Sequence, residues 1–187
     1  MSDLWNAQTL WNALKDTAIS EPGLPCLSVP SREERNYHRE GLLWSYGDVA
    51  ERVGGLIDHY SAKGYGHGHR VSLLLENRPE FMLHFLALNA LGCWVIPLNP
   101  DFRQDDLAHI MGHSDVDLVV TLGQHTDNLE TARDSLGRST PIIDVDTFGS
   151  TLSTATRLGR NAPPGRDSEA VLMYTSGTTG MPKGCII

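Results

Sequence analysis

The stretch of sequence that decides the fold reads Arg70-Val-Ser-Leu-Leu-Leu-Glu-Asn-Arg-Pro-Glu-Phe-Met-Leu-His-Phe-Leu-Ala-Leu-Asn-Ala-Leu-Gly-Cys-Trp-Val-Ile-Pro97. Its first apolar run, Val71–Leu75, has the length of a buried strand. Pro79 then fits the first turn of a helix, where a missing N–H group costs nothing. Residues Phe81–Leu91 are apolar almost all round, which predicts a buried helix. Cys93–Ile96 follows as a second strand, so the stretch predicts a β-α-β unit.

The same alternation continues toward the C-terminus. The sequence predicts a helix over Asp105–His113, a strand over Val116–Leu122, a helix over Thr126–Leu136 and a strand over Ile142–Val145. Strands that alternate with helices form parallel sheets, because each helix carries the chain back to the start of the next strand. The fold class is therefore α/β, with a mostly parallel sheet that has helices on both faces.

We expect one domain with four segments. Residues 1–69 contain N-terminal helices and short strands, including a helix that Ser45 would cap. Residues 70–147 form the β-α core. Residues 148–169 are rich in Ser, Thr, Gly and Pro and read as a connector. Residues 170–187 hold a strand, a loop and the start of another strand.

Composition excludes several classes of protein. The 187 residues carry a formal net charge of -8, which disfavours binding to nucleic acid or to anionic membranes because both need clustered Lys and Arg. The cysteines Cys26, Cys93 and Cys185 are odd in number and lack a C-x-x-C spacing, which favours reduced thiols. The N-terminus lacks the pattern of a signal peptide, and the uncharged residues 81–100 are interrupted by polar side chains and prolines. We expect no membrane span and a cytoplasmic location.

One loop has a composition that suits phosphate. Residues Tyr174-Thr-Ser-Gly-Thr-Thr-Gly-Met-Pro-Lys-Gly184 combine four Ser and Thr hydroxyls, three glycines and one lysine. Glycine lets backbone N–H groups approach oxygens closely, the hydroxyls donate further hydrogen bonds, and Lys183 supplies a positive charge. A triphosphate is the ligand that this combination suggests.

This loop differs from a Walker A loop, which needs Gly directly before the lysine and a hydroxyl directly after it. Pro182 and Gly184 occupy those positions, and residues 184–187 read as the start of a strand. The loop is therefore predicted to join two strands and to bind anions without a helix dipole. On composition alone, an ordinary Gly/Ser/Thr turn between strands is an equally good interpretation.

The complete eleven-residue string resembles the phosphate-binding signature of the adenylate-forming superfamily, which includes acyl-CoA synthetases, luciferases and the adenylation domains of nonribosomal peptide synthetases. The segments Leu43–Val49, Gly68–Phe81 and Leu91–Pro100 resemble earlier motifs of that family in order and spacing. The strings Glu76–Phe81 and Pro97–Pro100 are more similar to acyl-CoA synthetases than to peptide-synthetase domains.

The resemblance implies a reaction and a set of residues. A small-molecule carboxylic acid would attack the α-phosphate of ATP in the presence of Mg²⁺, giving an acyl-adenylate and pyrophosphate, and the acyl group would then pass to a thiol such as coenzyme A. Fatty acid metabolism is the expected setting. The residues implied to cradle the β- and γ-phosphates are Thr175, Ser176, Gly177, Thr178, Thr179, Gly180 and Lys183. Lys183 would offset charge on the departing pyrophosphate.

Similar proteins continue with segments that hold the nucleoside and the acyl group, supply an acidic Mg²⁺ ligand and carry a second catalytic lysine. After Lys183 this sequence has neither a lysine nor an acid. We therefore expect an incomplete N-terminal part of the large domain, without a Mg²⁺ ligand and inactive alone, whose partner would be a separate C-terminal portion. The strand Ala170–Tyr174 would then keep an exposed edge, because its usual neighbours would come from that portion. The alternative is a non-catalytic α/β module or pseudoenzyme subunit that docks on a separate C-terminal half.

Three other positions are weaker candidates. His109 and His113 are four residues apart on a predicted helix and would suit a metal, but no third ligand is evident, so ordinary surface or partly buried histidines are favoured. Ser176 lacks the G-x-S-x-G context of a hydrolase nucleophile. His69 stands where the family usually has Asp, and we expect it to satisfy a turn N–H group without a fixed charge.

Overall fold

The computed structural model describes residues 9–175 and 181–187. Its centre is a parallel four-stranded sheet with the strand order β4-β3-β5-β6. In this register Val71 lies beside Val95 of β4 and beside Leu118 of β5. The parallel α/β sheet predicted from the sequence is therefore confirmed. The strands are β3 (Arg70–Leu74), β4 (Trp94–Pro97), β5 (Leu118–Thr121) and β6 (Ile142–Asp144).

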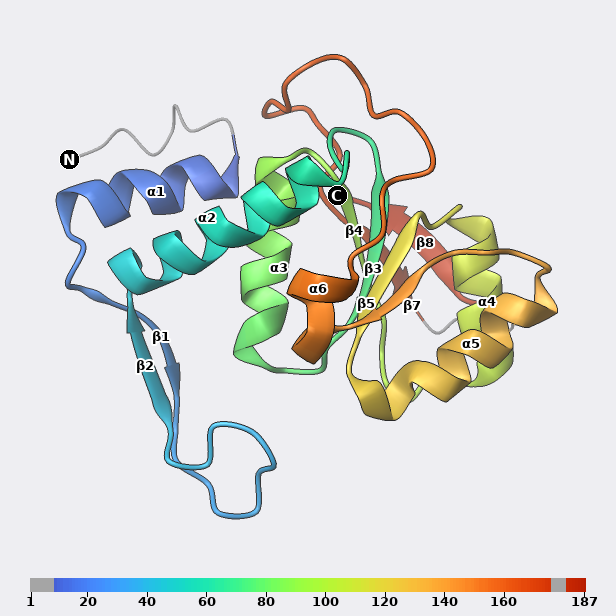
Figure 1. The fold of residues 1–187 in the computed structure, drawn as a ribbon, viewed down its shortest axis with the longest axis horizontal. Helices are drawn as coiled ribbons and strands as arrows, with labels where there is room; N and C mark the ends of the chain where they lie inside the picture. Colours follow the sequence, from blue (N-terminus) through green and yellow to red (C-terminus); the bar gives the residue numbers. More distant parts are fainter. Residues whose placement is uncertain (1–8, 176–180) are drawn as a thin grey trace.

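Helices cover both faces of this sheet, as predicted (Figure 1). Alternate residues of each strand point to opposite faces, so the sheet has two hydrophobic cores. In β3, Leu73 joins the core beneath α2 and α3, whereas its neighbour Leu74 joins the core beneath α4 and α5. The helices are α2 (Tyr46–Ala62), α3 (Pro79–Ala90), α4 (Gln104–His113) and α5 (Thr126–Ser135).

Two helices begin where local chemistry predicts. Ser45 caps α2: its hydroxyl accepts from the N–H of Asp48 at 3.2 Å, and the Asp48 carboxylate accepts from the N–H of Ser45 at 2.8 Å. This reciprocal arrangement satisfies two of the N–H groups that the start of a helix leaves without partners. Pro79 is the first residue of α3. Both predicted helix starts are confirmed.

The N-terminal part packs beside the sheet and extends away from it. Helix α1 (Leu10–Ser20) contacts α2 and α3, and β1 (Pro25–Val29) pairs antiparallel with β2 (Leu42–Ser45). Figure 1 shows this β1–β2 hairpin projecting from the body of the protein. Within the residues that the structure describes, no helix is both long enough and apolar enough to cross a membrane.

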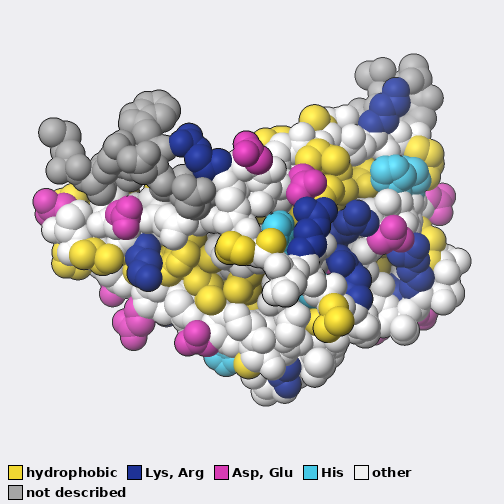
Figure 2. Space-filling view, turned by 90° about the horizontal axis from the view of Figure 1, so that it is seen from above, with side chains coloured by type: hydrophobic (Ala, Val, Ile, Leu, Met, Phe, Trp, Pro, Cys, Tyr) yellow, Lys and Arg dark blue, Asp and Glu magenta, His cyan; other side chains and the backbone are white. Residues whose placement is uncertain are grey.

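The connector between the core and the last two strands is attached to the core by charged side chains. It begins with the short helix α6 (Phe148–Thr151). Arg157 donates two hydrogen bonds of 2.6 Å to the carboxylate of Asp117, which lies just before β5 in the core. Within the connector itself, Arg160 pairs with Glu169 at 3.2 Å. On the face shown in Figure 2, Lys and Arg side chains gather on one half with acidic side chains beside them. The arginines of the connector therefore have structural partners.

The last two strands form a hairpin at the edge of the sheet. Strand β7 (Leu172–Thr175) pairs antiparallel with β8 (Lys183–Ile186), and a parallel bridge joins Val171 to Val95 of β4. The predicted strand after the loop is thus confirmed. Our expectation that residues 170–174 would leave a strand edge open is wrong, because β8 pairs along that edge.

Candidate functional site

The hairpin brings together the two described members of the predicted phosphate-binding set. In the register of β7 and β8, Thr175 lies opposite Lys183. Both residues are exposed, and residues directly opposite each other in an antiparallel pair point to the same face. A hydroxyl and an ammonium group therefore share one exposed face at the end of the hairpin next to the predicted loop. The other predicted members, Ser176, Gly177, Thr178, Thr179 and Gly180, lie outside the described residues.

The position of this hairpin fits a general property of α/β sheets. Because β7 begins parallel to β4, its carboxyl end lies at the same edge as the carboxyl ends of the four core strands. Ligands of open α/β sheets bind at that edge, in the crevices outside the strand ends. Thr175 is the last residue of β7, so the predicted loop leaves the sheet at this edge.

Close packing holds the two strands of the hairpin together. Tyr174 points to the buried side, with 7% of its surface exposed, and lies opposite Gly184. A Cβ atom on Gly184 would lie 3.2 Å from Cζ of Tyr174 and 3.0 Å from Cδ1 of Leu172. The missing side chain of Gly184 therefore makes room for the Tyr174 ring. Burial raises the pKa of Tyr174 above its ordinary value, which keeps the phenol neutral.

The two histidines of α4 contact the hairpin. The rings of His109 and His113 stack with centroids 5.6 Å apart. Nε2 of His109 lies 3.1 Å from the carbonyl oxygen of Pro182, and Nδ1 of His113 lies 2.7 Å from the hydroxyl oxygen of Tyr174. No group of three or more His, Cys, Asp or Glu that could hold a metal ion occurs among residues 9–175 and 181–187. The sequence spacing placed both rings on one helix face, but it carried no signal for their partners.

His69 is fully buried in the turn before β3. Its Nδ1 accepts a hydrogen bond from the N–H of Gly66 at 3.1 Å, and its Nε2 lies 2.9 Å from the carbonyl oxygen of Arg157. The expectation that His69 satisfies a turn N–H group is confirmed. Its second contact joins this turn to the connector and was not predicted.

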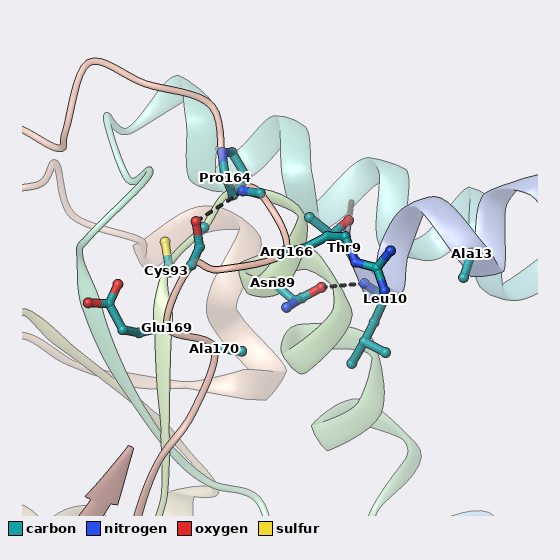
Figure 3. Close-up of a pocket in the computed structure, with 12 residues that line it drawn as sticks. Thr9, Leu10, Ala13, Asn89, Cys93, Pro164, Arg166, Glu169 and Ala170 are labelled. Atoms are coloured by element: carbon teal, nitrogen blue, oxygen red, sulfur yellow. Dashed lines mark hydrogen bonds between the residues drawn. The ribbon is translucent and has the colours of Figure 1, made fainter. Parts of the chain in front are cut away.

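A separate pocket of about 280 Å³ lies near the start of β7 (Figure 3). The start of α1, the end of α3 and the connector line it, and within it the side-chain oxygen of Asn89 accepts from the N–H of Leu10 at 3.0 Å. Its lining includes Ala170, whereas Thr175 and Lys183 are not part of it. The pocket and the predicted phosphate loop therefore lie at opposite ends of β7.

The fold and the hairpin define an α/β protein with a Gly- and Thr-rich loop at the carboxyl edge of its sheet. The chain belongs to the family of AMP-binding enzymes, whose model matches residues 26–187.

Individual relatives support this assignment. The chain is 33% identical over 151 residues to a sulfoacetate–CoA ligase from Cupriavidus necator, covering 79% of this chain and 30% of that protein. It is 28% identical over 164 residues to a crotonobetaine/carnitine–CoA ligase from Salmonella paratyphi A, covering 79% and 31%. The N-terminal domain of FACL13 from Mycobacterium tuberculosis has the same fold, with a TM-score of 0.77 at 22% identity over 97% of this chain and 44% of that chain. The chain thus spans about a third of the length of these curated relatives.

Proposed function

We propose that this chain is the N-terminal portion of an ATP-dependent, AMP-forming carboxylate–CoA ligase. The observation that carries the proposal is the hairpin, which places Thr175 opposite Lys183 on an exposed face at the carboxyl edge of the sheet. The two curated relatives described above are both named as CoA ligases, which favours coenzyme A as the acyl acceptor. The proposed substrates are a small carboxylic acid, with fatty acids as one class to test, and ATP.

In this proposal the loop holds the β- and γ-phosphates. Thr175 and the hydroxyls and N–H groups of residues 176–180 donate hydrogen bonds to phosphate oxygens, and Lys183 offsets the charge that develops on pyrophosphate as it leaves. Lys183 is exposed, so its ammonium group is accessible to a ligand without rearrangement of the core. Such groups accelerate the reaction when they stabilise the transition state more than the bound substrate.

Mg²⁺ would neutralise phosphate charge in this reaction, but the described residues offer no cluster of acidic or histidine ligands for it. A polypeptide that supplies the remaining length of the relatives is the proposed partner, and the 187-residue chain alone is proposed to be inactive.

Two further assignments follow the same reasoning. We propose a cytoplasmic location, which the three free cysteines favour because disulfides are rare in reducing compartments. We also propose that the four segments 1–69, 70–147, 148–169 and 170–187 belong to one partial domain.

The test measures binding and turnover separately. Inorganic tripolyphosphate is titrated into the ¹⁵N-labelled 187-residue protein, and binding with a dissociation constant of about millimolar is expected, because a few phosphate contacts must offset the entropy of association. Lys183→Ala should weaken this binding by about tenfold or more, since it removes a charge-assisted contact. Lys63→Ala, which removes an exposed lysine after α2, is the matched control.

Turnover is measured as carboxylate-dependent exchange of pyrophosphate into ATP. No exchange is expected from the 187-residue protein alone. Equal binding by Lys183→Ala and wild type would show that the loop assignment is wrong. Binding without turnover, even when the remaining length of the relatives is supplied as a separate chain, would favour the non-catalytic module.

A further inference from the structure

Helix α4 is attached to both strands that flank the predicted loop. Its two histidines lie one helical turn apart, and their hydrogen-bond partners lie on opposite sides of the predicted loop in sequence. Tyr174 precedes the loop on β7, whereas Pro182 follows it, directly before β8. A single turn of one helix therefore contacts the chain on both sides of the loop.

The contact to Pro182 has a fixed direction. A carbonyl oxygen can only accept a hydrogen bond, so Nε2 of His109 must carry the proton. Pro182 is buried, and because proline has no N–H group, its carbonyl oxygen is the one backbone group of this residue that can form a hydrogen bond. The histidine side chain therefore holds the backbone at the point where the chain enters β8.

The contact to Tyr174 is held on two sides. The ring of His113 meets the ring of Tyr174 edge to face, with centroids 5.8 Å apart and an interplanar angle of 88°. On the opposite strand Gly184 leaves the space that the Tyr174 ring fills. Rotation of Tyr174 away from α4 would lose both the ring contact and the hydrogen bond to Nδ1.

Helix α4 is itself a rigid support. Leu107, Ile110 and Met111 are at most 2% exposed and form part of the core on this face of the sheet. A buried support matters because Thr175 and Lys183 bind phosphate well only when they are already held in place, and ordering them during binding would cost conformational entropy.

We propose that His109 and His113 are positioning residues that hold Tyr174 and Pro182, so that Thr175 and Lys183 are kept opposite each other where they bind the triphosphate of ATP. The proposal rests on the proposed function, since it assigns a role in that same loop. The histidines act through Tyr174 and Pro182 and do not themselves touch the phosphates.

The experiment compares tripolyphosphate binding, measured by NMR titration, among three double variants and wild type. His109→Ala with His113→Ala removes both hydrogen bonds and should weaken binding by about tenfold, the sum expected for two neutral hydrogen bonds. His109→Gln with His113→Asn keeps a side-chain donor or acceptor at the position of each bonded nitrogen and should recover most of the affinity. His59→Ala with His67→Ala, which replaces two histidines away from the hairpin, should bind as wild type does.

The outcomes of the binding experiment separate the positioning role from the proposed function. If the alanine pair folds and binds as tightly as wild type, the positioning role is refuted while the proposed function stands. If the Gln/Asn pair binds as weakly as the alanine pair, the hydrogen bonds are not what matters, and the inference fails. If wild type itself does not bind tripolyphosphate, the proposed function fails and the inference fails with it. If the alanine pair does not fold, Tyr174→Phe, which removes one hydroxyl, must weaken binding, and unchanged affinity would overturn the inference.

Discussion

The buried imidazole of His84 makes the stability of this protein depend on pH. His84 lies on α3 with 3% of its surface exposed, its Nδ1 is 2.8 Å from the hydroxyl oxygen of Tyr60, and the ring of Phe148 packs against it at 4.8 Å between centroids. Burial lowers the pKa of His84 from 6.5 to about 3. In the folded protein His84 therefore stays neutral over a pH range in which the unfolded chain binds a proton.

The direction and the size of the pH effect on the free energy of unfolding follow from this difference in the pKa of His84 between the folded and unfolded states. Above pH 6.5 both states are neutral at His84, and the full contribution to stability is present. As the pH falls from 6.5 toward 3, the unfolded state gains a proton that the folded state does not bind, so stability is lost at about 1.4 kcal/mol per pH unit. At pH 4.5 the loss through His84 should be roughly 3 kcal/mol, a large part of the stability of an ordinary domain.

The assay is urea unfolding followed by tryptophan fluorescence at pH 7 and at pH 4.5. His84→Asn removes the titrating ring but keeps a polar group near Tyr60, so its free energy of unfolding should fall less between the two pH values than that of wild type, by roughly 3 kcal/mol. His59→Asn on α2 is the control, because His59 is exposed and its hydrogen bond stays within its own helix. An equal pH dependence of wild type and His84→Asn would refute the argument.

Two further substitutions test the packing that supports the site. Asp117→Ala should lower the free energy of unfolding by about 1 to 3 kcal/mol, because Arg157 loses two charge-assisted hydrogen bonds. Amide exchange in the connector should also become faster. Unchanged exchange would contradict a role for the Arg157–Asp117 pair in attaching the connector. Gly184→Ala should destabilise the hairpin by about 1 kcal/mol or more, since the new Cβ meets Tyr174 and Leu172, whereas Gly55→Ala in the open interior of α2 should stabilise by about 0.5 to 1 kcal/mol. The amide of Thr175 should exchange faster in Gly184→Ala than in wild type, and Gly55→Ala should leave that exchange unchanged. Exchange of Thr175 in Gly184→Ala equal to that in wild type would contradict the packing argument.

The sequence predicts the core of the fold well because local signals there agree with one another. Strands β3 (Arg70–Leu74) and β4 (Trp94–Pro97) lie within one residue of the predicted ones, Pro79 begins a helix, and Ser45 caps another. Each of these features depends on neighbours within a few positions, and a parallel sheet follows once strands alternate with helices. The pairing of His109 and His113 with the hairpin is different. Their partners lie 73 and 61 residues further along the chain, and spacing on a helix shows which rings share a face without showing what that face meets.

The error about the strand edge has a physical cause of the same kind. Residues 170–174 are predicted to take their strand neighbours from a separate C-terminal portion, but residues 183–186 are nearer along the chain than any other candidate partner and pair with them. Closing a short loop costs little entropy, and the cost rises only slowly with loop length, so pairing with the next strand in sequence is favoured over pairing with a distant one. Gly184 adds to this preference by accepting the Tyr174 ring. The edge that the hairpin leaves open is therefore that of β8, where all four residues are exposed, and a further strand that extends this side of the sheet would add to β8 rather than to β7.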